Sequence, residues 1–236
     1  MEKAPANLEL VLRYFADFSA AQLQQMAALD ELYRDWNDKI NVISRKDIDS
    51  LYEKHVLHSL SIAAAFELEK GMEVIDIGTG GGFPGIPLAI FFPEVQFHLV
   101  DSIGKKIKVV QAVSEAIGLQ NVTVQHCRAE EIKNRKFDVA VSRAVAPLKD
   151  LWTWAKPLLK KPGTRPHSTH QSSGPPSPGA EPQALPIPRG LICLKGGDLA
   201  AEIAESACKP RMMEIHDIFA EDYFLEKYLL YTPIGQ

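Results

Sequence analysis

The spacing of apolar residues changes near residue 70. Before it, apolar residues recur every three or four positions, as on one buried helix face: Leu23, Met26, Leu29, Tyr33, Trp36 and Ile40. Ser19 followed by Gln22 is a capping-box pattern, and it predicts where this helix begins. A second helix is predicted over 47–66, with these buried positions: Ile48, Leu51, Leu60 and Ala64. Residues 1–70 are therefore predicted to form a helical N-terminal extension.

After Gly71, short runs rich in β-branched and aromatic residues alternate with helical patterns. Strands are predicted at 73–77, 96–100, 122–126, 138–142 and 191–194, and helices at 84–91, 105–117 and 148–159. This alternation is typical of a doubly wound α/β fold, in which parallel strands are joined by right-handed crossovers. Two further runs, 212–218 and 227–232, are predicted to pair antiparallel at the sheet edge. Residues 71–236 thus form the second predicted domain.

The segment 162–188, PGTRPHSTHQSSGPPSPGAEPQALPIP, interrupts this pattern. It is rich in Pro, Ser and Gly and has almost no large apolar residue, so burial would not offset the entropy cost of ordering it. We predict a flexible insertion within the second domain, at a place where a short turn between helix and strand would suffice. A proline-rich docking site is the alternative.

Composition and charge narrow the range of functions. With 46% hydrophobic residues, the chain can form a full core, which excludes global disorder. The net charge is −4 and the pI is about 6.0, whereas strongly basic nucleic-acid binders lie above about 9. Any contact with RNA must therefore come from a local basic patch.

The cysteines and the hydropathy indicate a cellular setting. Cys127, Cys193 and Cys208 are odd in number and widely spaced, a pattern that gives neither a disulfide framework nor a zinc motif. No apolar run approaches the roughly 20 residues that span a bilayer, and the N-terminus has no apolar signal segment. We expect a cytoplasmic protein that has no membrane partner and no metal site and that is a monomer.

The stretch VIDIGTGGGFPGIPLAIFFP, residues 74–93, carries the clearest chemical signal. Glycines after a parallel strand let the backbone approach a ligand and adopt positive φ. Gly80, Gly82 and Gly85 fit the dinucleotide pattern G-x-G-x-x-G, whereas residues 76–82 fit D-x-G-x-G-x-G, the nucleoside loop of S-adenosylmethionine-dependent methyltransferases. A tight turn that only packs strand on helix is the alternative without a ligand.

The prolines behind the loop favour the methyltransferase pattern. A pyrophosphate needs free N–H groups at the helix start, and Pro84 and Pro87 each remove one. S-adenosylmethionine has no phosphate; it needs an acid near its ammonium, a partner for its ribose hydroxyls and an apolar slot for adenine. Asp76 ends the first predicted strand and could meet the ammonium. Asp101 follows the second strand and could bind the ribose, although it would serve a dinucleotide equally well.

The chain resembles the ribosomal RNA small-subunit methyltransferase G family, also called glucose-inhibited division protein B, in strings that occur in order: YRDWNDKINVIS, DIGTGGGFPGIPLAI, DSIGKKIKVVQAV, AEE, VSRAVAPL and LKGGD. The resemblance runs from about Tyr33 to Leu159 and resumes at LKGGD. It implies a class I methyltransferase fold with a helical N-terminal extension and S-adenosylmethionine as cofactor. It also implies methylation of N7 of one guanine in 16S ribosomal RNA, within the small ribosomal subunit.

The resemblance further implies cofactor contacts at Gly78 and Phe83 in the loop, at Ala129–Glu130 after the third strand and at Arg143 after the fourth. Gly80 is the next glycine of the same loop. For Arg143 the alternative is a structural ion pair, and for Glu130 a solvated acid at a helix start. Guanine N7 carries a lone pair and no proton, so no residue is predicted to act as a general base.

The predicted RNA contacts rest on a rim of basic residues around the cofactor site: Arg34, Lys39, Arg45, Lys46, Lys105, Lys106, Lys108, Arg143 and Lys195. Acids in the extension nearly neutralise its part of this rim. Two other functions remain open: a small-molecule methyltransferase on the same fold, and a cofactor-binding protein without turnover. One departure from the family is the string HVLHSL: His58 stands at a position that is usually an acid, so this chain has no acid there to orient His55 or RNA.

Overall fold

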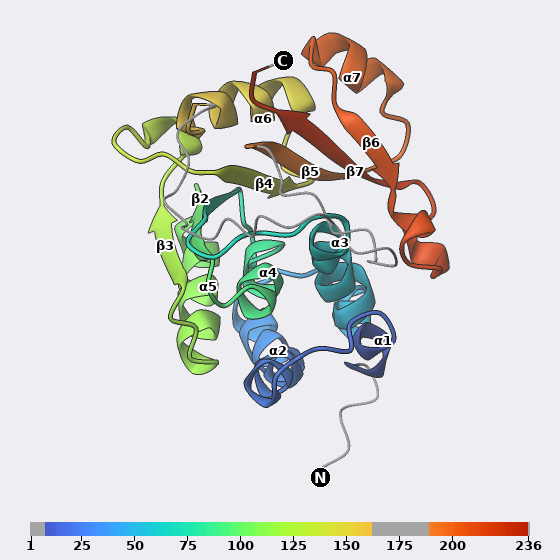
Figure 1. Ribbon diagram of the computed structural model, residues 1–236. Helices are drawn as coiled ribbons and strands as arrows, with labels where there is room; N and C mark the ends of the chain where they lie inside the picture. Colours follow the sequence, from blue (N-terminus) through green and yellow to red (C-terminus); the bar gives the residue numbers. More distant parts are fainter. Residues whose placement is uncertain (1–7, 162–188, 236) are drawn as a thin grey trace, which may run out of the picture.

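The computed structural model describes residues 8–161 and 189–235. A seven-stranded sheet forms the middle layer, in the order β3-β2-β1-β4-β5-β7-β6 (Figure 1). Its first five strands in chain order pair in parallel: β1 (Glu73–Ile77), β2 (Gln96–Asp101), β3 (Val122–His126), β4 (Val139–Arg143) and β5 (Gly190–Gly196). β7 (Lys227–Pro233) pairs antiparallel with β5 and with β6 (Arg211–Glu214). The predicted parallel sheet and its antiparallel edge are confirmed.

Helices cover both faces of the sheet (Figure 1). α4 (Gly85–Phe91) and α5 (Gly104–Ala116) lie on one face together with the N-terminal helices, and α6 (Leu148–Ala155) and α7 (Ala200–Ser206) lie on the other. The predicted helix over 148–159 is α6 followed by a 3₁₀ turn. α7 was not predicted, because Ser206 is its one buried residue and the helix therefore has no apolar stripe.

The N-terminal segment begins with α1 (Leu8–Leu12) and α2 (Ala20–Lys39). The predicted capping box is confirmed: the Gln22 N–H donates to Ser19 Oγ over 3.3 Å, and the Ser19 N–H donates to Gln22 Oε1 over 2.9 Å. The predicted second helix is wrong in detail. It consists of a 3₁₀ turn (Ile48–Ser50), a π-helical turn (Tyr52–Leu57) and α3 (His58–Ala65), and Ala64 is exposed rather than buried. A π turn holds more residues per turn, so a buried stripe counted at α-helical spacing does not carry through residues 52–57, whereas Ala64 lies beyond that turn, in the last turn of α3.

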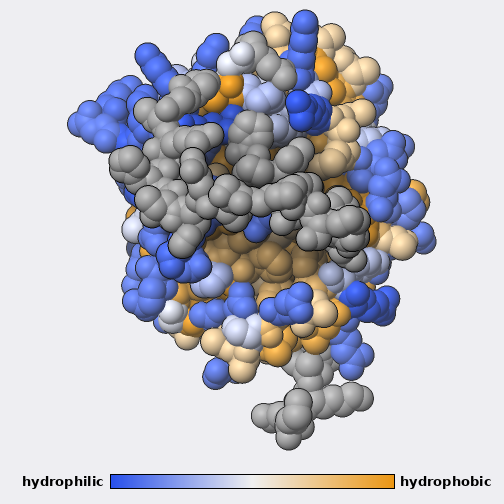
Figure 2. All heavy atoms as spheres, viewed as in Figure 1, coloured by the Kyte–Doolittle hydropathy of each residue, from blue (hydrophilic) through white to orange (hydrophobic). Residues whose placement is uncertain are grey.

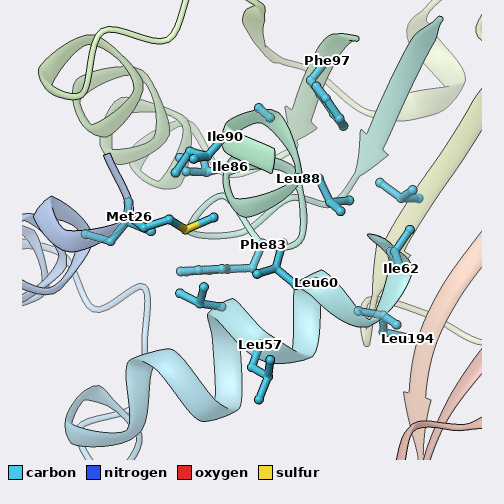
Figure 3. Packing of buried hydrophobic residues seen from close by; sticks show 14 of the residues in the cluster. Met26, Leu57, Leu60, Ile62, Phe83, Ile86, Leu88, Ile90, Phe97 and Leu194 are labelled. Carbon is cyan, nitrogen blue, oxygen red and sulfur yellow. The ribbon is translucent and has the colours of Figure 1, made fainter. Parts of the chain in front are cut away.

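The N-terminal helices and the sheet share one hydrophobic core. Met26 of α2 and Leu60 of α3 lie close to Phe83 and to the α4 residue Leu88 (Figure 3), and all four are buried. A second core lies under α6 and α7. The division of the chain after residue 70 stays a prediction, and the predicted insertion at 162–188 lies outside the described residues. Within residues 8–161 and 189–235, no helix is both long and apolar enough to cross a membrane.

Candidate functional site

A cavity of about 450 Å³ lies at the carboxyl ends of β1 to β4. This is the edge at which open α/β sheets bind their ligands. Seven residues that the sequence singled out for cofactor contact line it: Gly78, Gly80, Phe83, Asp101, Ala129, Glu130 and Arg143. Asp76 was also singled out, and it does not line the cavity.

The loop after β1 owes its shape to glycines at two kinds of position. Gly78 and Gly80 both have positive φ, of 70° and 59°. At Gly78 a Cβ atom would lie 2.6 Å from a methyl carbon of Val145, so the loop and the segment after β4 approach too closely for any side chain. At Gly80 a Cβ would meet nothing within 4 Å. The Gly80 N–H donates to Asp101 Oδ2 over 2.9 Å, which ties the loop to the end of β2.

The start of α4 offers no free donor to a phosphate. Pro84 and Pro87 have no N–H. The Gly85 N–H donates to Asp76 Oδ2 over 2.9 Å, and the Ile86 N–H donates to the Gly82 carbonyl over 2.7 Å. Residues 84–87 therefore have no unused backbone N–H, in agreement with what the two prolines led us to expect.

Asp76 lies beneath the loop and is fully buried. Its Oδ2 accepts hydrogen bonds from Thr79 Oγ1 over 2.6 Å and from the Gly85 N–H, whereas its Oδ1 has no partner. Burial raises the pKa of Asp76 to about 7, against the lowering effect of these two donors. In this structure Asp76 holds the loop and the start of α4 together from below.

Asp101 forms the polar wall of the cavity. Its Oδ1 accepts from the Ile103 N–H over 2.8 Å and its Oδ2 accepts from Gly80, so backbone donors orient both oxygens and leave each a further lone pair. The apolar wall is unusually open to solvent: Ile103 is 47% exposed and Val145 is 44% exposed. Ala129, in the 3₁₀ turn Ala129–Glu131, completes it. The cavity therefore pairs an oriented carboxylate with uncovered apolar side chains.

Arg143 ends β4 and joins the cavity to the N-terminal segment. Its Nη1–H donates to the Lys54 carbonyl over 3.2 Å and its Nη2–H donates to His55 Nδ1 over 2.8 Å. The guanidinium carbon lies 5.1 Å from the centroid of the Phe83 ring. No carboxylate of the described residues is ion-paired with Arg143, so the structural ion pair considered above is not found.

His55 holds Arg143 as a neutral acceptor. Burial, followed by the charge of Arg143, lowers the pKa of His55 to about 3. Because Nδ1 accepts the hydrogen bond from Arg143, the proton of the neutral ring lies on Nε2. His55 is therefore a partly buried helix residue that orients a cation, rather than a base.

Residues of the string YRDWNDKINVIS hold the glycine loop and the cavity wall beside it. Tyr33 is fully buried, its hydroxyl donates to the Gly81 carbonyl over 2.6 Å, and its ring lies 4.9 Å from that of Phe83. Asn37 Oδ1 accepts from the Val42 N–H over 2.9 Å, and Val42 lines the cavity. Sequence reasoning used this string for the resemblance alone and missed its contacts with the loop.

The predicted basic rim is not assembled. Arg34 and Lys39 are ion-paired with acids near them in the N-terminal segment, and Lys195 is buried in an ion pair of 2.7 Å with Glu202. Four other candidates are exposed and do not line the cavity: Arg45, Lys46, Lys105 and Lys108. Lys106 and Arg143 do line it. On the face shown in Figure 2, hydrophilic residues gather mostly at the two sides and apolar patches lie between them.

The sheet order, the antiparallel β7, the glycine loop after β1 and the acid at the end of β2 define a class I methyltransferase fold. The model of the family described as rRNA small subunit methyltransferase G matches residues 22–166. The chain belongs to this family, as its motifs indicated.

Two relatives in sequence agree with this assignment. Ribosomal RNA small subunit methyltransferase G of Phocaeicola vulgatus is 52% identical over 228 residues, covering 97% of this chain and 99% of that protein. The protein of the same name from Parabacteroides distasonis is 50% identical, covering 97% of this chain and 90% of that protein. Among solved structures, a SAM dependent methyltransferase from Aquifex aeolicus has a TM-score of 0.49 at 14% identity, covering 80% of this chain and 98% of that chain. The first two relatives match nearly the whole chain.

Proposed function

We propose that this protein transfers a methyl group from S-adenosylmethionine to N7 of a guanine in 16S ribosomal RNA. The observation that carries the proposal is spatial: residues of five family motifs, spread from residue 42 to residue 145, line one cavity at the ligand-binding edge of the sheet. The proposal includes a cytoplasmic location and a monomeric enzyme.

The residues of the cavity fit the parts of S-adenosylmethionine. Asp101 would accept from the ribose hydroxyls, because its oxygens are oriented and still have lone pairs. Ile103 and Ala129 would hold the adenine, and the exposed apolar surface of Ile103 would then be covered. Arg143, which has no carboxylate partner among the described residues, would bind the methionine carboxylate. The contact predicted between Asp76 and the methionine ammonium is left out, because the Asp76 carboxylate does not line the cavity.

The chain contributes positioning rather than proton transfer. S-adenosylmethionine, when bound, supplies an electrophilic methyl group on a sulfonium. Guanine N7 has no proton to lose, so no general base is needed. His55 is neutral and adds no charge to the site. Tyr33 fixes the loop at Gly81, and His55 fixes the guanidinium of Arg143. The first contact is buried and the second is partly buried, so the site is held in place before any ligand arrives.

One observation favours a second candidate, a small-molecule methyltransferase. Of the basic residues expected around the site, Lys106 and Arg143 are the ones that line the cavity, and the expected basic rim is missing. A small acceptor would need no such rim. The two candidates differ in the acceptor and share the cofactor.

The test uses methyl-labelled S-adenosylmethionine and small ribosomal subunits or 16S RNA from cells that lack this enzyme, with digestion of the RNA to nucleosides. Label in 7-methylguanosine is expected. Asp101→Asn removes the charge at the proposed ribose contact and should lose most of the cofactor affinity, measured by calorimetry. Glu94→Gln is the matched control, because Glu94 is exposed and paired with Lys70 near the start of β1, at the opposite edge of the sheet. Cofactor binding without labelled RNA would favour the small-molecule acceptor or a protein without turnover.

A further inference from the structure

The sheet edge continues beyond the cavity across β5 and β7. Arg143 ends β4 and pairs with Leu194 of β5, and Gly196 at the end of β5 pairs with Lys227 at the start of the antiparallel β7. Lys227 therefore lies on the same edge as Arg143, on the side away from β2 and β3. The residues proposed to hold the cofactor leave this half of the edge free.

Two lysines meet around one aromatic ring on this half. Lys54 Nζ lies 5.8 Å and Lys227 Nζ lies 5.5 Å from the centroid of the Tyr223 ring. The Tyr223 hydroxyl donates to the Lys54 carbonyl over 3.4 Å, and the same carbonyl accepts from Arg143. We call Lys54, Tyr223 and Lys227 the lysine–tyrosine cluster. Through the Lys54 carbonyl, it directly adjoins the cavity wall.

The cluster has an ammonium group without an acidic partner. Lys54 is ion-paired with Asp47 over 2.6 Å, whereas no ion pair to Lys227 occurs among residues 8–161 and 189–235. The fold makes room for this group: at Gly196 a Cβ atom would lie 3.0 Å from Lys227 Nζ. The acids whose charges act on Tyr223 are Asp47 and Glu53, against the cations Lys54 and Arg143. With Lys227 added, positive charge exceeds negative charge here.

His58 lies behind the cluster and leaves this charge in place. Its ring is 5.8 Å from that of Tyr223, it is 5% exposed, and neither ring nitrogen has a hydrogen-bond partner. Burial and the nearby cations Arg143 and Lys227 lower the pKa of His58 well below its usual value, so the ring is neutral. A neutral ring neither adds to the charge of Lys227 nor cancels it.

We propose that the lysine–tyrosine cluster binds a backbone phosphate of the acceptor RNA beside the cavity, with Lys227 making the direct contact. The inference rests on the proposed function, since it assigns to RNA the half of the edge that the cofactor residues leave free. Phosphate is the group that every RNA strand presents, and the ammonium of Lys227, which has no acidic partner among the described residues, suits it. One phosphate contact at this edge would thus hold the acceptor RNA, in place of the predicted rim of basic residues.

The test measures RNA affinity over a range of salt concentrations for the full-length chain and its Lys227→Gln variant. Loss of one phosphate contact should weaken binding roughly five- to tenfold at about 0.1 M salt and reduce the slope of log K against log salt by about one. The KM for RNA should rise by a similar factor while kcat at saturating RNA is retained. Affinity for S-adenosylmethionine, measured by calorimetry, should stay unchanged, which also shows that the variant folds.

Two matched variants make the result specific. Lys227→Arg keeps the charge and should retain most of the affinity and the salt slope. Lys70→Gln removes an exposed lysine near the start of β1, at the opposite edge, and should bind RNA like the unmodified protein. An unchanged salt slope for Lys227→Gln, in a protein that methylates RNA normally, would overturn the cluster and leave the proposed function intact. Absence of both RNA binding and RNA methylation in the unmodified protein would overturn both.

Discussion

Replacing Gly78 with alanine separates two reasons for a glycine in the cofactor loop. Gly78 has a φ of 70°, and a left-handed backbone costs an L-residue about 1–2 kcal/mol. A Cβ there would also lie 2.6 Å and 2.7 Å from the two methyl carbons of Val145, and overpacking of this kind costs about 1–3 kcal/mol. Gly78→Ala should therefore lower the free energy of unfolding by about 2–5 kcal/mol.

Gly80 provides the matched control within the same loop. Its φ is 59°, yet a Cβ there would meet nothing within 4 Å, so Gly80→Ala should show the backbone cost alone. Urea unfolding of both variants, and of Gly78→Ala combined with Val145→Ala, measures the difference. Val145→Ala removes the two methyl groups that the new Cβ would meet. In that background, Gly78→Ala should therefore lower the free energy of unfolding by about as much as Gly80→Ala lowers it in the unmodified protein. Equal destabilisation of the two single variants would refute the close approach of Val145 as the reason for Gly78.

Substitutions at three further residues test the contacts around the cavity. Tyr33→Phe leaves the Gly81 carbonyl without its donor and should lower the free energy of unfolding in urea by about 1–3 kcal/mol; no loss would mean that this bond contributes nothing. The pKa of Asp76 is raised from 3.8 to about 7, so its stabilising contribution is complete below 3.8 and is lost as the pH rises through 7. Between about pH 5 and about pH 8, the free energy of unfolding should therefore fall less for the Asp76→Asn variant than for the unmodified protein. Parallel plots of this free energy against pH would contradict the raised pKa. His55→Leu removes the acceptor for Arg143 and should weaken S-adenosylmethionine binding about 10- to 100-fold by calorimetry, whereas His55→Asn offers an oxygen near the Nδ1 position and should retain most of the affinity; equal losses would exclude orientation by that acceptor.

Local patterns predicted most of the fold. The start of α2 follows from Ser19 and Gln22, which satisfy each other within one turn, and the parallel strands follow from short apolar runs. The π-helical turn Tyr52–Leu57 could not be predicted, because no residue type in this segment marks the point at which a turn takes in an extra residue. α7 was missed for the opposite reason, since it buries one residue and needs no apolar stripe.

The sequence predicted the position of those site residues that follow directly after a strand, because the strand alone determines where they lie. The glycines and Asp101 follow directly after strands, and strand ends meet at one edge in a parallel sheet. Asp76 shows the limit of this reasoning: its place at the end of β1 was predicted correctly, but its side chain points toward the start of α4, where it binds Gly85. The pairing of Arg143 with His55 joins residues 88 positions apart and had no local signal.

The helical N-terminal segment controls both walls of the cavity. On one side, Tyr33 of α2 holds the carbonyl of Gly81 in the loop after β1. On the other side, the π-helical turn supplies the Lys54 carbonyl and His55 Nδ1, which accept from Arg143 at the end of β4. A ligand that binds between these walls must therefore bind the packed state of the helices more tightly than a state in which they have separated from the sheet. Cofactor affinity and the packing of the segment are then linked in both directions, because a ligand stabilises the state it prefers by the same free energy that this state adds to its binding.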